Sequence, residues 1–289
     1  MKHKKHFLNL RIFPRFYFLL LTTYLLLTPG CTKKSEQTAV DTTAKQMRAI
    51  KIEPVTGSPE YPNAKIVIVS PREGQVIENA KDSVRVVMQV TGTHLGVPTD
   101  ADSTKGIAYS KEGQHVHVII DDKPYMADYK NGQPFNVGIL SPGLHTIRAF
   151  PSYSWHESIK SPGAFATRTF YVGVEPKQLR TPQAPTLAPV NNLNGPLLTY
   201  SRPKGSYAAS DTAKILLDFY VTNATLASDG YKMKFWIDSA VMPDIIKWQP
   251  YFIEGLPKGK HTLRMQLVDP KGNAVPGTYN NPSAEISIE

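Results

Sequence analysis

Two histidines stand two residues apart in the stretch "GQHVHVIIDD", residues 113–122. Alternate residues of a β-strand share a face, so His115 and His117 lie on one face together with Ile119, and the apolar residues between them face the core. Neutral imidazoles at this spacing can chelate one zinc or copper ion. The spacing therefore predicts half of a metal site, or alternatively the solvent-facing side of an ordinary sheet, with both rings pointing outward or into a surface cleft.

Further histidines are concentrated in the same part of the chain. Of the eight histidines, five lie between residues 94 and 156. His94 and His156 are the candidates to complete a metal site with His115 and His117, and copper or zinc is the ion that four imidazoles would select. Carboxylates that could add oxygen ligands or orient the rings are Asp121, Asp122 and Glu157.

A second candidate site is the segment "FPSYSWHESIKSPGAF", residues 150–165. It is longer than its counterpart later in the chain and should form a loop between the last two strands of a domain. Loops at the end of a sandwich often bind other molecules, and exposed tryptophan and tyrosine suit protein or sugar surfaces. The residues predicted to bind a partner are Tyr153, Trp155, His156 and Glu157. The alternative is a tryptophan folded back as a local plug.

The sequence lacks the signatures of the common enzyme classes. There is no Gly-x-Ser-x-Gly turn, no P-loop, and no Gly-x-Gly-x-x-Gly followed by a helix. A blue-copper site needs a thiolate, and the single cysteine, Cys31, lies far outside the histidine-rich region. We therefore predict no catalytic residues, with a metal-dependent hydrolase as the weaker alternative. The net charge of +9 includes five basic residues in the first 15, and no dense basic stripe indicates nucleic-acid binding.

The N-terminus has the composition of a secretion signal. A basic head is followed by the short apolar run "FYFLLLTTYLLLTPG" and then Cys31. The end of this run, "LLTPGC", resembles the lipobox of bacterial lipoproteins, although Thr28 and Pro29 depart from the usual pattern. The resemblance implies that residues 1–30 are removed and that Cys31 is lipidated. It also implies a lipid-anchored protein of the cell envelope; since Thr32 follows the cysteine, the expected location is the outer membrane, facing the periplasm.

Composition divides the rest of the chain. Residues 31–63 are polar and punctuated by proline, which predicts a flexible tether. Residues 175–196 contain five prolines and predict a semi-rigid linker. The predicted domains are residues 64–174 and 197–289.

These two domains repeat four blocks in the same order. "VSPREG" matches "YSRPKG", "VRVVMQVTG" matches "ILLDFYVTN", "HVHVIIDD" matches "KMKFWIDS", and "LSPGLHTIRAF" matches "LPKGKHTLRMQ". In this alignment His145 corresponds to His261, which predicts a shared structural role. His115 and His117 correspond to Lys232 and Lys234, which favours a solvent-facing position over a metal site.

The blocks are short, rich in β-branched and aromatic residues, and separated by turn residues. This pattern resembles immunoglobulin and fibronectin type III modules, and it implies an all-β chain of two tandem Ig-like β-sandwiches. The leading functional hypothesis is a lipid-anchored binding or structural module that meets an envelope protein or glycan through loops of the first sandwich. The alternative is a periplasmic copper- or zinc-binding lipoprotein that uses the His-x-His strand.

Overall fold

The computed structural model describes residues 50–100, 108–174 and 191–289, all of which belong to one compact unit, Thr42–Glu289. Cys31, the predicted signal peptide, the tether before residue 50 and most of the predicted linker lie outside the described residues. Within the described ranges, no helix is both long and apolar enough to cross a membrane. The described secondary structure consists of strands and short 3-10 turns, so the prediction of an all-β fold is confirmed.

The first sandwich is built from two facing sheets. One has the strand order β2-β4-β7 and the other the order β3-β9-β8-β5-β6. Its strands are β2 (Lys65–Ser70), β3 (Gln75–Ile77), β4 (Val84–Thr91), β5 (His115–Ile120), β6 (Met126–Asp128), β7 (Pro134–Gly138), β8 (Gly143–Ser152) and β9 (Ala166–Val172). Between the sheets lies an apolar core that includes Ile66, Val86, Val118, Ile147 and Phe170.

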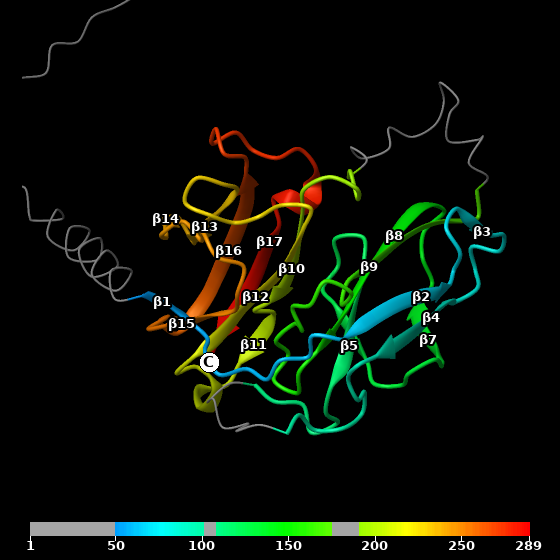
Figure 1. Cartoon of the computed structure of the whole chain (residues 1–289), viewed down its shortest axis with the longest axis horizontal. Coiled ribbons are helices and arrows are strands. Elements are labelled where there is room, and N and C mark those ends of the chain that lie inside the picture. Colours follow the sequence, from blue (N-terminus) through cyan, green and yellow to red (C-terminus); the bar gives the residue numbers. More distant parts are fainter. Residues whose placement is uncertain (1–49, 101–107, 175–190) are drawn as a thin grey trace, which may run out of the picture. The chain divides into compact units, whose positions relative to one another are not determined.

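The second sandwich repeats this arrangement strand for strand (Figure 1). Its strands are β10 (Leu197–Arg202), β11 (Gly205–Tyr207), β12 (Ile215–Thr222), β13 (Lys232–Ile237), β14 (Ala240–Val241), β15 (Tyr251–Glu254), β16 (Gly259–Val268) and β17 (Ser283–Ile288). The 3-10 turns η2 (Ala209–Asp211) and η3 (Thr278–Asn280) lie between strands. The parallel pair β3–β9 has its counterpart in β11–β17, and the bulged antiparallel pair β2–β4 in β10–β12. The tandem repeat of two Ig-like sandwiches is therefore confirmed.

The histidine shared by both repeats has the same contacts in each. The His145 ring bonds the Asp121 carboxylate at 2.8 Å and the Ser141 carbonyl at 2.7 Å. The ring of His261 makes the equivalent bonds to Asp238 at 2.9 Å and to the Pro257 carbonyl at 2.8 Å. Both aspartates have positive φ, of 55° for Asp121 and 53° for Asp238, directly after the strand that carries them. The predicted structural role is confirmed: each ring ties the turn after one strand to the loop before another.

Replacing this ring should destabilise the sandwich without touching any candidate site. We expect His261→Ala to lower the free energy of unfolding by about 2 kcal/mol, because it removes two hydrogen bonds of a buried ring and leaves the partly buried Pro257 carbonyl without its donor. Urea unfolding of the variant and the wild-type protein measures this difference. A change smaller than about 0.5 kcal/mol would contradict the structural role.

The predicted tether is wrong in its last part. Residues Lys51–Pro54 form β1, which pairs antiparallel with β15 at the edge of the second sandwich (Figure 1). Val55 and Ala64 are buried in a cluster with Trp155 of the first sandwich and Phe252 of the second. The polar composition predicts a flexible segment, but the unpaired edge of β15 provides backbone hydrogen-bond partners that order these residues as a strand.

The two sandwiches share a buried interface. All six residues of β5 are buried, as are the first seven of β12, so each of these strands is covered on both faces. One interface cluster contains Ile119, Tyr125 and Phe150 of the first sandwich together with Tyr220 of the second. The equivalent strand β13 is buried only at alternate residues. The second sandwich therefore contributes to the burial of the outer face of β5, and the His-x-His pair lies at this interface.

Candidate metal centre

The two strand histidines are completely buried, each with 0% of its surface exposed. The prediction that they point to solvent or into a surface cleft is therefore wrong. Their valine and isoleucine neighbours do face the core of the first sandwich, as expected. The opposite face of the strand, with both histidines and Ile119, is covered by Tyr125, Tyr129 and His156 of the first sandwich together with Ser201 and Tyr220 of the second.

A third histidine joins them from the loop after β8. β5 pairs with β8 in a register that sets His115 opposite Ser152. The chain then turns tightly, with a bond from the Tyr153 N–H to the Glu157 carbonyl at 2.9 Å. At the tip of this turn His156 has a φ of 67°, a left-handed conformation that is uncommon outside glycine and that occurs at functional sites. This conformation places its ring over that of His115.

The three rings direct nitrogen atoms toward a common point. His115 Nε2 lies 3.1 Å from His117 Nε2 and 2.9 Å from His156 Nδ1, and all three atoms lie within 4.8 Å of one another. A metal ion bound by imidazoles at about 2.0–2.1 Å brings their nitrogens to about 3.3 Å apart in a tetrahedral arrangement. Small rotations of the rings would therefore accommodate one ion. We refer to His115, His117 and His156 as the histidine cluster.

The hydrogen bonds on the far side of the rings orient them for metal binding. His115 Nδ1 lies 2.9 Å from the Gly113 carbonyl, and His117 Nδ1 lies 2.9 Å from Ser201 Oγ. A carbonyl only accepts, so His115 Nδ1 carries the proton and its Nε2 presents a lone pair to the other two rings. Metal-bound histidines commonly have their second nitrogen held in this way.

The contacts among the three rings cannot all be good hydrogen bonds. His115 Nε2 has one lone pair but two nitrogen neighbours within 3.1 Å, so at most one of these contacts is a good hydrogen bond. Extra protons do not relieve the conflict, because burial opposes the charged form. Burial lowers the pKa of His115 to about 4 and that of His156 to about 2, and it lowers the pKa of His117 well below its ordinary value. At neutral pH the three rings are therefore neutral, and each can offer a nitrogen lone pair to a metal ion.

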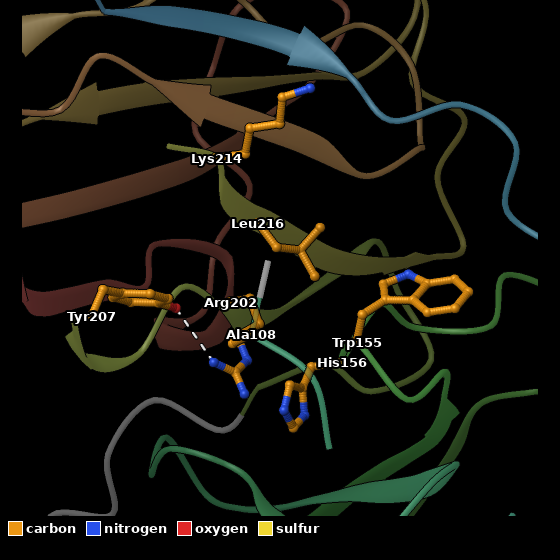
Figure 2. A pocket seen from close by; sticks show the side chains of 7 residues that line it. All are labelled: Ala108, Trp155, His156, Arg202, Tyr207, Lys214 and Leu216. Carbon is orange, nitrogen blue, oxygen red and sulfur yellow. Dashed lines mark hydrogen bonds between the residues drawn. The ribbon is translucent and has the colours of Figure 1, made fainter. Parts of the chain in front are cut away.

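Aromatic and cationic side chains surround the cluster. The Tyr125 ring stacks on His117 with centroids 3.5 Å apart, and its hydroxyl lies 3.2 Å from His156 Nδ1. Lys204 Nζ lies 3.6 Å from the centroid of Tyr125 on the second sandwich's side. Figure 2 shows Arg202 beside His156 in a small pocket, with a hydrogen bond from the guanidinium to the Tyr207 hydroxyl. The positive charges of Arg202 and Lys204 further lower the pKa of all three histidines.

The structure brings together only part of the predicted ligand set. His94 is exposed and is not a member of the cluster. Asp121 is hydrogen bonded to His145, and Glu157 accepts a bond from Trp155 Nε1 at 2.7 Å. Asp122 is exposed. The prediction that these residues supply further ligands is therefore not supported by the geometry, and His156 is the one addition to the strand pair.

The aromatic loop is buried instead of exposed. Trp155 has 1% of its surface exposed, Tyr153 4% and Glu157 3%. Tyr153 and Trp155 stack with centroids 4.9 Å apart, and Trp155 packs in a cluster with Leu216 and Phe252 of the second sandwich. The expectation of an exposed aromatic surface is wrong, because the second sandwich covers this loop. Its binding role toward a protein or glycan stays an untested prediction.

Sequence reasoning missed every contribution from the second sandwich. Ser201, Arg202 and Lys204 lie in the block "YSRPKG". The sequence identifies this block only as the counterpart of "VSPREG" in the repeat. One signal was available in β5 itself: the face with the two histidines ends in Ile119 and carries no charged residue. A solvent-facing strand would normally carry charge, so this composition is more typical of a strand covered on both sides.

Comparison with known proteins identifies fold neighbours but no family. No family model matches the sequence, and no curated protein is similar to it. Among solved structures, the chain is similar to fibronectin(III)-like modules of Clostridium thermocellum CbhA, at 13% identity over 78% of this chain and 94% of that one, with a TM-score of 0.25. It is also similar to the Bacteroides ovatus mixed-linkage glucan utilization locus protein SGBP-B, solved with a heptasaccharide, at 12% identity over 78% of this chain and 47% of that one, with a TM-score of 0.22.

A further neighbour is described as a putative membrane anchored protein from Corynebacterium diphtheriae, at 11% identity over 83% of this chain and 57% of that one, with a TM-score of 0.26. At these identities the likeness concerns the fold alone. The strand order and sheet pairing make the chain an all-β protein of two Ig-like sandwiches with a histidine cluster at their interface.

Proposed function

We propose that this chain is a binding module that holds a single copper ion in the histidine cluster. The observation that carries the proposal is the convergence of three neutral imidazole nitrogens, those of the buried His115 and His117 and of the partly buried His156; the last two lie 3.1 and 2.9 Å from His115 Nε2. Two of the rings have their other nitrogen fixed by Gly113 and Ser201. This arrangement supplies ligands, ring orientation and exclusion of water.

The charges around the cluster favour a monovalent ion. The three ligands are neutral, no carboxylate belongs to the group, and both Arg202 and Lys204 are close enough to lower the histidine pKa values. Burying a divalent ion beside two cations costs more than burying a monovalent one, since the repulsion scales with the charge. Imidazole nitrogen suits both copper and zinc, so charge decides between them, and we infer Cu(I).

The surroundings of the cluster favour storage or transfer of the ion over catalysis. The pocket lined by His156, Arg202 and Trp155 has a volume of about 10 Å³, which is room for one water molecule. A substrate larger than water would not reach the nitrogens through it. A binding role therefore fits this site better than a hydrolytic one.

We further propose that the module works in the cell envelope, anchored through a lipid on Cys31 and facing the periplasm from the outer membrane. The basic head, the apolar run and the lipobox-like "LLTPGC" support this proposal. A protein or glycan partner would then meet surfaces other than Trp155, because that residue is buried.

The metal content of the purified compact unit, Thr42–Glu289, tests the proposal. We expect one copper per chain after reconstitution with Cu(I) and removal of excess ion, measured by mass spectrometry of the metal. Competition with a coloured Cu(I) chelator should show that His117→Ala and His156→Ala each weaken binding at least 100-fold.

His94→Ala is the matched control, because His94 is an exposed histidine of the same sandwich outside the cluster. We expect it to bind copper like the wild-type protein. Stoichiometric zinc with no competition from Cu(I) would refute the choice of ion. Absence of both metals, in a protein that is folded by circular dichroism, would refute the metal site.

A further inference from the structure

A second site lies between the sandwiches, separate from the nitrogen cluster. It is a cavity of about 590 Å³, within the size range of small-molecule pockets. The first sandwich contributes Ile119 and the turn from Asp122 to Tyr125, and the second contributes Tyr200, Lys204 and Tyr279. Arg148 of β8 completes the wall.

Arg148 is a buried cation without a carboxylate partner. It is 4% exposed, and within the described ranges no carboxylate oxygen lies within 4.0 Å of it. Its Nη atoms bond neutral oxygens of Leu198, Thr199 and Asp121, and its Nε is buried with no partner. Its guanidinium carbon lies 3.7 Å from the ring centroid of Tyr279. Burial of a guanidinium is expensive unless an anion compensates it.

A second cation lines the same cavity with unused donors. Lys204 Nζ makes one hydrogen bond, to the Tyr125 carbonyl at 2.7 Å, which leaves two of its three N–H groups unpaired. The acidic residues that line the cavity, Asp122 and Glu285, are both exposed. The buried part of the cavity is therefore positive, whereas its acidic groups lie at the rim.

Two of the three tyrosines that line the cavity have a cation on a ring face. Tyr125 is stacked between His117 and the Lys204 ammonium, and Arg148 lies over one face of Tyr279. A sugar ligand normally stacks on an open ring face, and Tyr125 provides none. The charged groups in the buried and partly buried part of the cavity are Arg148 and Lys204, and Lys123 adds an exposed cation to the lining.

We propose that this cavity binds a small organic anion whose carboxylate or phosphate oxygens lie against Arg148 and Lys204. A guanidinium and an ammonium are the standard recognition groups for such oxygens. The carboxylates of Asp121 and Asp122 act on Arg148 without forming an ion pair with it, and the anion supplies the direct ion-pair partner. This site does not use the histidine nitrogens, so the metal-free protein tests it separately from copper binding, although Lys204 acts on both sites.

Isothermal titration of the metal-free compact unit Thr42–Glu289 with citrate, and separately with inorganic phosphate, tests the proposal. We expect saturable binding of one anion per chain, with a Kd of millimolar or tighter, for at least one of the two. Tighter binding of citrate would identify the preferred group as a carboxylate, and tighter binding of inorganic phosphate would identify it as a phosphate. Absence of saturable binding in both arms would overturn the proposal.

Variants assign the binding to the two cations. We expect Lys204→Gln and Arg148→Lys each to weaken binding at least tenfold. Arg264→Gln is the matched control, because Arg264 also lies over an aromatic ring, 3.9 Å from the Trp236 centroid, but outside the cavity. It should leave binding unchanged. Equal affinity in all three variants would show that the anion binds elsewhere and would overturn the assignment.

A stability measurement separates a ligand-binding arginine from a structural one. Arg148→Met keeps the side-chain volume and removes the buried charge. If Arg148 serves a ligand, the melting temperature without anion should stay equal or rise, and the rise that citrate or phosphate causes in the wild-type protein should be lost. A melting temperature that falls strongly, with the anion response intact, would overturn the proposal.

Discussion

Lowering the pH from 6.5 to 4.5 is expected to destabilise the metal-free protein by several kcal/mol through the histidine cluster. Burial lowers the pKa of His115 to about 4 and that of His156 to about 2, whereas an unfolded chain titrates histidine near 6.5. Between these values the unfolded state binds protons that the folded state excludes, so stability falls as the pH falls. Each of the two histidines contributes up to about 1.4 kcal/mol per pH unit, and about 2 kcal/mol over this range because the unfolded histidine is only half protonated at pH 6.5.

The effect should be large enough to unfold the protein in mild acid. The total stability of a domain is about 5–15 kcal/mol, and His117 adds to the loss in the same direction because burial also lowers its pKa. Urea unfolding at half-unit steps between pH 7 and pH 4.5, with a chelator present, measures the slope. A variant with His115→Gln and His156→Gln should show a much flatter slope.

Comparison with this variant removes the contribution of other groups. Burial lowers the His145 pKa, but the hydrogen bonds to Asp121 and to the Ser141 carbonyl, together with the charge of Asp121, outweigh it and raise the pKa; burial raises the pKa of Glu157 and Asp128. These three shifts oppose the acid destabilisation. They are common to both proteins, so the difference between the two pH profiles reports the cluster alone. Parallel profiles would show that the three rings are not buried as neutral groups.

The same cluster shows how far the sequence could lead. Strand periodicity correctly placed His115 and His117 on one face of a strand, and the repeat alignment correctly gave His145 and His261 a common structural role. Both inferences depend on local geometry: a strand alternates its side chains whatever lies beyond it. His156 is among the predicted ligands on different grounds, the concentration of histidines in the first repeat, and that ground also includes His94, which is not in the cluster.

What covers a strand face is decided by contacts distant in sequence. The hydrogen bond from His117 to Ser201 joins residues 84 positions apart, and the one between Ser158 and Asp218 joins residues 60 apart. The repeat alignment even pointed the wrong way. It aligned His115 and His117 with Lys232 and Lys234. The outer face of β13, which carries these lysines, is only partly buried, whereas the equivalent face of β5 is fully buried. Two repeats with one fold therefore have different neighbours, and a repeat pattern cannot report which faces its copies bury.

The largest effect of a single substitution is expected at the polar centre of the interface between the sandwiches. Asp218 on β12 is completely buried. Its carboxylate accepts bonds from Lys160 Nζ at 2.6 Å, Ser158 Oγ at 3.0 Å and the Ser158 N–H at 3.2 Å. We expect Asp218→Ala to lower the free energy of unfolding by about 3–5 kcal/mol, because it leaves a mostly buried ammonium without its counter-charge and two donors without an acceptor.

An exposed ion pair of similar geometry provides the control. Lys234 Nζ lies 2.9 Å from Asp244 in the second sandwich, and both side chains are about one-third exposed or more. Solvent screens such a pair, so Asp244→Ala should cost less than about 1 kcal/mol. Urea unfolding of both variants measures the contrast. Equal costs would show that water reaches Asp218 and that the interface is looser than these contacts require.

The Asp218 variant also connects the interface to the metal site. Ser158 and Lys160 belong to the loop that carries His156, so Asp218 helps to hold the third imidazole over His115. Loss of this anchor should free the loop and weaken copper binding at least tenfold, although Asp218 touches none of the three nitrogens. Adding Lys160→Met to Asp218→Ala removes the unpaired charge and should recover part of the stability, but not the affinity for copper. Recovery of both would mean that charge burial alone, and not the position of the loop, connects Asp218 to the cluster.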